Sequence, residues 1–311
     1  MLVLVLVFVL AGCGAAQSPP TPTFTWPPIV DSHVHLSYDP VASDLAAHGV
    51  LAAVDLAAPE RTLGQRAPIE VLAAGPMLTR PGGYPLDAWG ADGYGIGCAD
   101  AGCVQTTIDR LASEGARVIK VALDDDGLDP ALLPAAVAAA HAHHLRVAVH
   151  ALSAASADAA ARAGVDVLAH TPVQPLSPAT IEAWRGRAVI STLAAFGASD
   201  AAISNLRALR AAGVTILYGT DLGNLRVDGA SADELDALRR AGLDDAAITA
   251  AMTTTPIAYW GLHLPAELEL DADPRSDARV LLHARVILRH AARATPPASR
   301  PSSDGTPGRS P

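Results

Sequence analysis

The stretch that decides the fold is VIKVALDDDGLDPALLPAAVAAAHAHHLRVAVHALSAASADAAARAGVDVLAH, residues 118–170. Three short apolar runs, at 118–123, 147–151 and 165–170, alternate with two Ala-rich segments of helical length. Continuous apolar runs, as opposed to alternating ones, are typical of strands that are buried on both faces of a parallel sheet. The stretch therefore predicts consecutive βα units.

The same alternation continues on both sides of this stretch. Eight apolar runs are found in all, at 29–35, 50–56, 71–75, 118–123, 147–151, 165–170, 188–193 and 214–221. Helices are expected at 130–145, 153–163, 177–185, 200–212 and 232–241, and several stop at a glycine, which is the usual residue after a helix C-terminus (Gly49, Gly115, Gly164 and Gly213). Eight such units in about 235 residues predict an α/β protein with a (β/α)8 TIM barrel over 29–263. A doubly wound open sheet is the main alternative.

Composition excludes several classes of protein. The chain has 311 residues, of which 50% are hydrophobic, so a mostly disordered protein is excluded. The formal net charge of −10 argues against binding of nucleic-acid phosphates. No apolar run reaches the roughly 18 residues that a membrane-spanning helix needs. Three cysteines are too few for a disulfide-built scaffold.

The two ends of the chain differ from the middle. Residues 2–11 are apolar and lead to Leu-Ala-Gly-Cys at 10–13, which is similar to a bacterial lipoprotein signal. We therefore predict a signal peptide over 1–13, lipidation of Cys13, and an exported protein anchored to a membrane in the periplasm or at the cell surface. Residues 14–28 are Pro-rich and predict a tether, and the polar, Pro-rich 292–311 predicts a disordered tail.

Six polar groups that can bind metals lie in or at the ends of five predicted strands: His33, His35, Lys120, His150, His170 and Asp221. In a barrel the C-terminal ends of the strands form one mouth, where active sites lie. Burying so many polar groups without partners would cost several kcal/mol each. Imidazole and carboxylate ligands suit zinc and similar divalent ions, so the pattern predicts a metal site.

This ordered set resembles the metal-dependent amidohydrolase superfamily, and GPMLTRPGGYP (75–85) and TTTPIAYWGL (253–262) resemble its imidazolonepropionase-like and Xaa-Pro dipeptidase-like branch. The resemblance implies two divalent ions, expected to be zinc, with His33, His35 and Asp221 on one side and His150 and His170 on the other. Asp221 would also be catalytic, as the acceptor of the proton of the attacking water. The small β-sandwich of the family would be truncated here to a vestigial β segment at 264–291.

Lys120 is the only lysine, in a chain that otherwise uses arginine. A neutral lysine amine can take up CO₂ to form a carbamate, and arginine cannot. The resemblance implies that a carbamate on Lys120 bridges the two metal ions. The alternative is a buried lysine that is paired with a carboxylate.

Loop residues supply weaker candidates. Arg80 is a candidate partner for a substrate carboxylate, and Tyr84, which stands where the family often has a histidine, is a candidate donor to the substrate carbonyl. Cys98 and Cys103 lie five positions apart in a Gly-rich stretch, and in an exported protein they are expected to form a local disulfide.

The function expected from these residues is metal-dependent hydrolysis of a C–N bond in a small amide or peptide-like substrate. Two alternatives remain open at this point. One is an esterase or lactonase that uses the same site, since activation of water does not select the bond. The other is a surface lipoprotein that binds metal without catalysis.

Overall fold

Backbone pairing arranges the strands in three sheets in this computed structural model, which describes residues 23–90, 92–124 and 126–288. The largest is a seven-stranded parallel sheet, in the order β11-β10-β9-β8-β7-β5-β6. Its strands are β5 (Met77–Thr79), β6 (Gly95–Gly97), β7 (Ile119–Ala122), β8 (Val147–His150), β9 (Val167–Leu168), β10 (Ala188–Ile190) and β11 (Thr215–Leu217). A second parallel sheet contains β2 (Ile29–Val34), β3 (Val50–Asp55) and β4 (Glu70–Ala73).

Each of the eight predicted apolar runs overlaps one strand of these two parallel sheets, so the α/β class is confirmed. The strands form two hydrogen-bonded sheets and not one continuous closed ladder. Backbone hydrogen bonds join the two sheets at both seams. The amide of Ser32 donates to the carbonyl of Tyr218 (2.9 Å), and the amide of Arg117 donates to the carbonyl of Ala73 (2.9 Å).

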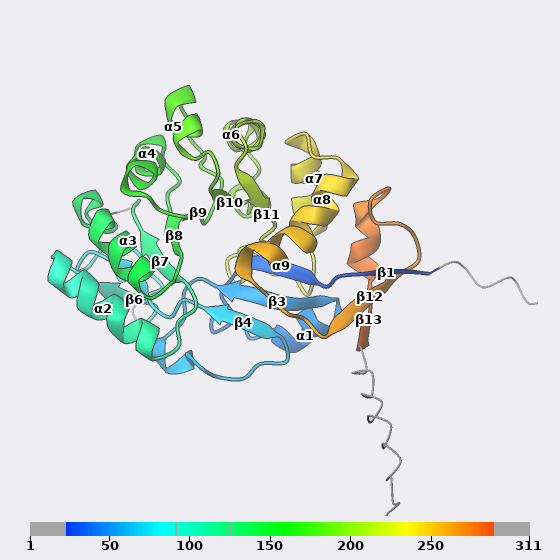
Figure 1. Cartoon of the computed structure of the whole chain (residues 1–311), viewed down its shortest axis with the longest axis horizontal. Coiled ribbons are helices and arrows are strands. Elements are labelled where there is room, and N and C mark those ends of the chain that lie inside the picture. The colour runs from blue at the N-terminus through cyan, green and yellow to red at the C-terminus, as the bar shows by residue number, and fades with distance from the viewer. Residues whose placement is uncertain (1–22, 91, 125, 289–311) are drawn as a thin grey trace, which may run out of the picture.

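Helices follow most of the strands and cover the outer side of the sheets (Figure 1). They are α1 (Ala42–Ala47), α2 (Ala101–Ser113), α3 (Leu133–Ala142), α4 (Ala154–Ala163), α5 (Pro178–Ala183), α6 (Asp200–Ala211), α7 (Ala232–Arg240), α8 (Asp245–Met252) and α9 (Thr254–Trp260). The five helices predicted with bounds correspond to α3 through α7, and the helices expected to stop at Gly49 and Gly115 are α1 and α2. Helices α8 and α9 were not predicted. None of the helices in the described ranges is long and apolar enough to cross a membrane.

Local sequence explains where these helices begin and end. Serine side chains accept a backbone N–H in the first turn of α4, α5, α6 and α7, which satisfies one of the donors that a helix start leaves free. At the end of α4, Gly164 has a φ of +86°, a conformation that other residues adopt only with strain. These signals are local, which is why the sequence located these helices well.

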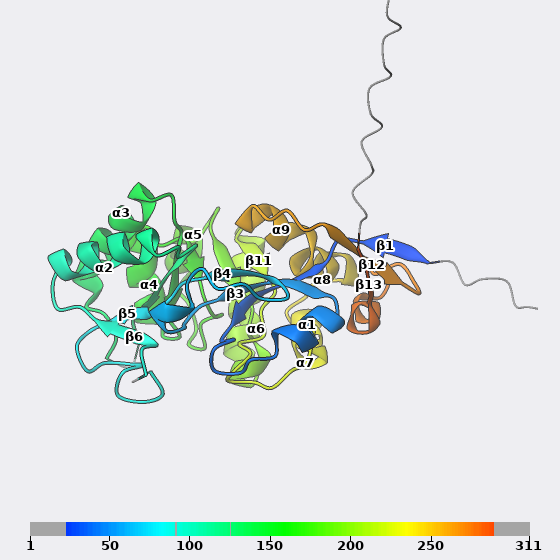
Figure 2. The same ribbon diagram turned by 90° about the horizontal axis from the view of Figure 1, so that it is seen from below.

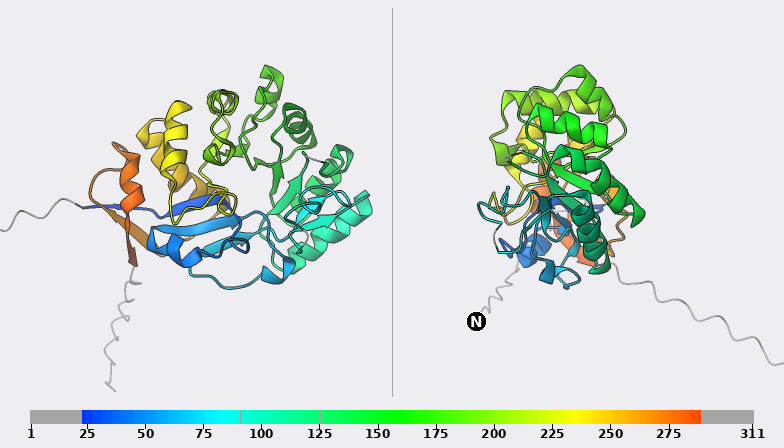
Figure 3. Two further views of the ribbon diagram at one scale, coloured as in Figure 1. Left: turned by 180° about the vertical axis from the view of Figure 1, so that it is seen from behind. Right: turned by 90° about the vertical axis from the view of Figure 1, so that its left-hand side faces the viewer.

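A third sheet joins the two ends of the described chain. Strand β1 (Phe24–Trp26) pairs antiparallel with β12 (Ala266–Leu270), which pairs with β13 (Arg285–Leu288). This sheet lies at one end of the molecule, beside α8 (Figures 2 and 3). It contains the predicted β segment. Strand β1, however, lies within 14–28, which was predicted to be a tether. The prediction missed this strand because the sequence does not reveal its distant pairing partner, β12.

Two layers of apolar residues hold the fold. One lies between the sheets and the helices and includes Leu45, Ile108, Leu206 and Leu235. The other is enclosed by the strands themselves, and it brings together Val54 of β3, Ala148 of β8, Ile190 of β10 and Leu217 of β11, all fully buried. Because side chains alternate along a strand, strands such as β3, β8 and β11 contribute to both layers. The predicted signal peptide, Cys13 and the predicted tail at 292–311 lie outside the described residues.

Candidate metal centre

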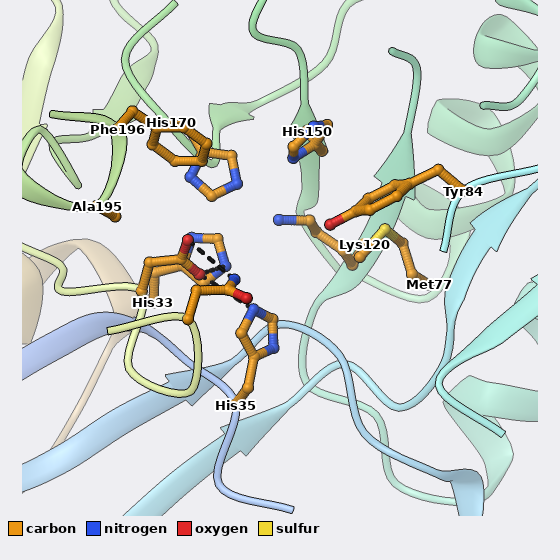
Figure 4. A pocket seen from close by; sticks show the side chains of 11 residues that line it. His33, His35, Met77, Tyr84, Lys120, His150, His170, Ala195 and Phe196 are labelled. Carbon is orange, nitrogen blue, oxygen red and sulfur yellow. Dashed lines mark hydrogen bonds and ion pairs between the residues drawn. The ribbon is translucent and has the colours of Figure 1, made fainter. Parts of the chain in front are cut away.

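The six predicted ligands come together at the C-terminal ends of the strands. His33 lies in β2 and His35 directly after it, Lys120 lies in β7, and His150 is the last residue of β8. His170 and Asp221 follow β9 and β11. All six are at most 5% exposed. Their side chains converge on one cavity, as Figure 4 shows for the five that it labels.

Backbone pairing explains how residues nearly 190 positions apart meet. The amide of Asp221 donates to the carbonyl of His33 (2.9 Å). The buried carboxylate of Asp31 accepts the amides of His33 and Thr220 (both 3.0 Å) and the Thr220 hydroxyl (2.5 Å). Asp31 therefore holds the end of β2 against the segment that carries Asp221.

Three of the six groups already have the geometry of a metal site. The Nε2 atoms of His35 and His33 lie 3.1 Å and 3.4 Å from Oδ1 of Asp221. One ligand atom from each of these residues lies within 4.8 Å of the others. Such a cluster of imidazole and carboxylate donors is typical of sites for zinc and related divalent ions.

Hydrogen bonds at Nδ1 orient two of the imidazole rings. Nδ1 of His33 lies 2.9 Å from the carbonyl oxygen of Ala169, and because a carbonyl only accepts, this nitrogen carries the proton. Nδ1 of His170 lies 3.0 Å from the hydroxyl of Thr192. Among the described residues, Nε2 of His33 and Nε2 of His150 are buried without a hydrogen-bond partner. Bound metal ions would satisfy both atoms. In metal sites a ligating histidine commonly has its other ring nitrogen held by a second group.

The electrostatics of the cavity keep these ligands in metal-binding forms. Burial holds the pKa of His33 and His170 well below the usual range, and burial followed by the charge of Lys120 lowers the pKa of His150 to about 4. These three imidazoles are therefore neutral at pH 7 and have a lone pair available. Burial opposes ionisation of Asp221, but the neighbouring histidines outweigh this and hold its pKa well below the usual range.

Lys120 is 1% exposed and lies in the same cavity. Burial lowers the pKa of its amine to about 7, while the charge of Asp221 acts in the opposite direction. A large fraction of a lysine with this pKa is neutral at physiological pH, unlike an exposed lysine. The neutral amine is nucleophilic, whereas the ammonium form is not.

The cavity has a volume of about 160 Å³. Besides the six ligands, it is lined by Met77, Tyr84, Ala195, Phe196 and Asn224. The amide of Asn224 donates to Oδ2 of Asp221 (3.1 Å), on the side of the carboxylate away from the histidines. Tyr84 thus lies where it was predicted.

The other predicted loop residues lie elsewhere. Arg80 does not line the cavity, because its guanidinium is bonded to Asp126 through the carbonyl oxygen and the carboxylate (both 2.7 Å). Cys98 and Cys103 form a disulfide, with Cα atoms 5.4 Å apart, at the N-terminus of α2.

Several residues of the site were not predicted. Asp31 had a signal, an acidic residue inside an apolar run, but Thr192, Phe196 and Asn224 had none, because loops after strands carry no periodic pattern. Thr192 has a φ of +39°, which is rare for a β-branched residue, and Asp221 has a φ of +58°. Such strained conformations often cluster at functional sites.

Comparison with known proteins supports the fold. No profile of a known family matches the sequence, and no match is found among curated protein sequences. Solved structures do match. A Xaa-Pro dipeptidase with methionine bound in its active site is similar over 85% of both chains, with a TM-score of 0.72 and 17% identity. An A. niger ochratoxinase matches over 85% of this chain and 82% of its own (TM-score 0.70, 20% identity). Bottromycin amidohydrolase matches over 89% and 79% (TM-score 0.66, 19% identity). The chain therefore has a fold of the kind found in Xaa-Pro dipeptidases and amidohydrolases.

Proposed function

We propose that this chain is a metal-dependent hydrolase that cleaves a C–N bond in a small amide or peptide-like substrate. The observation that carries the proposal is the cluster of His33, His35 and Asp221, with two further buried imidazoles and Lys120 around one small cavity. The names of the structural relatives, a dipeptidase and an amidohydrolase among them, agree with hydrolysis of an amide. The same groups also suit an ester, so amide specificity is part of the proposal.

Two divalent ions, expected to be zinc, fit the donors of the cavity. His33, His35 and Asp221 would hold one, and His150 and His170 would contribute to the other. The unpartnered Nε2 atoms of His33 and His150 support this fit. When bound, such ions lower the pKa of water and polarise a carbonyl.

The residues of the chain supply the remaining chemistry. The ionised carboxylate of Asp221, held by Asn224, accepts the proton of the attacking water and passes it to the leaving nitrogen. The side chain of Tyr84 lines the cavity, where its hydroxyl can donate to the substrate carbonyl oxygen as negative charge develops.

We propose that Lys120 carries a carbamate. Its neutral amine would attack CO₂, so that a N–C bond forms, one C–O π bond breaks and one proton passes from the nitrogen to solvent. The product is a carbamate anion in place of the neutral amine, and its two oxygens would serve as ligands for the two metal ions. The burial of Lys120 and the lowered pKa of its amine support this step.

We also propose that the two parallel sheets form a (β/α)8 barrel. Two observations support it: the hydrogen bonds from Ser32 to Tyr218 and from Arg117 to Ala73 across the seams, and the apolar layer that strands of both sheets share.

Cys13 is proposed as the site of a lipid anchor on an exported protein. The test is fractionation of cells that express the whole chain. The wild type is expected with membranes, and Cys13→Ala is expected to be released or left unprocessed. A wild-type protein that is found in the cytoplasm with residues 1–12 intact would contradict the proposal.

The test of function is metal analysis together with a screen of dipeptides, N-acyl amino acids and their ester counterparts. We expect about two divalent ions per chain with bicarbonate present, and loss of hydrolysis on chelation that zinc restores. His170→Ala should lose mainly one ion. His141→Ala is the matched control, since His141 is exposed and bonded to Asp166.

Each unfavourable result has its own meaning. One ion per chain under excess metal and bicarbonate would contradict the two-metal site. Hydrolysis of esters alone would indicate an esterase or lactonase. No hydrolysis of any compound by the metal-loaded protein would favour a binding protein.

A further inference from the structure

Aromatic residues are scarce in this chain but concentrate around the candidate metal centre. The sequence has four tryptophans, five tyrosines and three phenylalanines. Five of these residues lie at the cavity and its mouth. Tyr38, Tyr84, Trp89 and Tyr94 form a connected group of rings, and Phe196 joins it through the rings of His170 and His150. The core of the protein is built mainly of Ala, Val, Leu and Ile, so the fold does not require rings at this place.

Two of the rings line the cavity itself. Phe196 packs edge-on against His170, with ring centroids 4.8 Å apart, and Tyr84 lies against His150 at 5.1 Å. Figure 4 shows the two rings on opposite sides of the group of ligands. A substrate whose scissile bond reaches the metal ligands must therefore pass between two aromatic side chains.

The other rings continue this wall outward. The indole N–H of Trp89 donates to the hydroxyl of Tyr84 (3.3 Å), and its ring lies 5.4 Å from His35. Trp89 also contacts Tyr94 (5.5 Å) and Tyr38 (6.1 Å), and Tyr38 is 56% exposed. The aromatic surface thus extends from the ligands to solvent.

We propose that the substrates are amides with an aromatic ring next to the scissile bond. Stacking and edge-to-face contacts with Tyr84 and Phe196 would bind the ring. This inference rests on the proposed hydrolase function, which it deepens by naming the class of substrate.

The experiment compares two compounds on the metal-loaded protein, N-benzoylglycinamide and N-acetylglycinamide, which differ in the aromatic ring. Release of benzoate or acetate gives kcat/KM. We expect N-benzoylglycinamide to be cleaved at least tenfold more efficiently than N-acetylglycinamide. Equal or better cleavage of N-acetylglycinamide would overturn the proposal and leave the hydrolase function intact.

A binding measurement distinguishes the recognition of aromatic amides from their hydrolysis. Quenching of tryptophan fluorescence by the two compounds, with Trp89→Phe as the reference, reports affinity without turnover. Preferential binding of N-benzoylglycinamide without cleavage would contradict the hydrolase function but support the recognition of aromatic amides. Equal affinity for both compounds would overturn the recognition as well.

Variants of Phe196 test whether its ring produces the preference for the benzoyl compound. Phe196→Ala should reduce the preference for the benzoyl over the acetyl compound at least fivefold, and Phe196→Leu should reduce it less. Phe24→Ala is the matched control, because Phe24 lies in β1, in the sheet that joins the chain ends. An unchanged preference in a folded Phe196→Ala protein would overturn the role of this ring. If that variant does not fold, Phe196→Leu and the wild-type comparison still decide the proposal.

Discussion

Lys120 shows how much a single residue can indicate. Its uniqueness in the sequence and its apolar neighbours suggested a chemical role, and the structure places it 1% exposed in the cavity that holds the histidines. Positive charge alone would be served by arginine, which the chain uses elsewhere. Arginine cannot form a carbamate, and its planar guanidinium is larger and stays charged.

We expect Lys120→Arg to lose at least 99% of the activity and the second metal ion, while the melting temperature shows that the fold persists. Lys120→Ala should also be inactive but should regain part of its activity with formate or acetate, because a small carboxylate can occupy the vacated space. Activity assays and metal analysis of both variants are the measurements. A fully active Lys120→Arg protein would contradict the carbamate. Lack of rescue alone would not, since the space can collapse.

At the scale of elements, a buried glutamate links α7 to the loop that closes the cavity. The carboxylate of Glu234 accepts the amide of Leu193 at one oxygen (3.0 Å) and the amide of Ala194 at the other (2.7 Å). These residues lead into the short 3₁₀ helix Ala194–Phe196, whose last residue packs on His170. Glu234 is a positioning residue, since it acts through this loop.

Glu234→Gln should displace this loop, because the glutamine NH₂ group would face one of the two amides as a second donor. An unsatisfied buried amide costs about 1–3 kcal/mol. We expect a lower melting temperature, a rise in KM for ring-bearing amides that exceeds the change in kcat, and an unchanged metal content. Glu182→Gln is the control, since Glu182 is exposed and pairs with Arg185. Loss of metal in Glu234→Gln would show that the glutamate acts on the ligands instead.

At the scale of the whole molecule, the three-stranded sheet joins segments from both ends of the chain to the same side of the fold. Trp26 of β1 donates its indole N–H to the hydroxyl of Thr253 (3.2 Å). Folding of the whole chain also buries a carboxyl group beside the candidate site, near His35. Asp55, at the end of β3, is 4% exposed, and its Oδ1 has no partner among the described residues. Burial raises the pKa of this carboxyl to about 7.

This shift makes stability depend on pH with a definite sign. A carboxyl with a raised pKa in the folded state stabilises the fold below its unfolded pKa, near 4, and the stabilisation is lost as the pH rises through about 7. Asp55→Asn should therefore gain melting temperature relative to the wild type between pH 5 and pH 8. The corresponding gain in the free energy of unfolding is at most about 4 kcal/mol, since the pKa is raised by about three units and each unit corresponds to about 1.4 kcal/mol. Thermal melts at both pH values measure it, with the exposed Asp87→Asn as the control. A difference that does not change with pH would contradict the raised pKa.

The sequence by itself determined the α/β class, the position of eight of the ten strands of the two parallel sheets and the starts and ends of five helices. It also singled out six of the groups that line the cavity. These features are readable because they depend on neighbours in the chain: a buried strand is a continuous apolar run, a helix ends at glycine, and a polar residue at the end of such a run is conspicuous. His150 at the end of VAVH is an example.

Only the tertiary structure decided which distant segments meet. Phe24–Trp26 reads as a linker until β12, more than 200 residues later, pairs with it. Arg80 reads as a substrate contact until Asp126 is seen to bind it, and Phe196 carries no signal until Glu234 holds its loop over His170. In each case the deciding partner is remote in sequence, and the residue's own neighbours contain no trace of it. The chemistry of the candidate site was therefore readable from the strands, whereas its shape and its choice of substrate depend on loops that only the folded chain brings together.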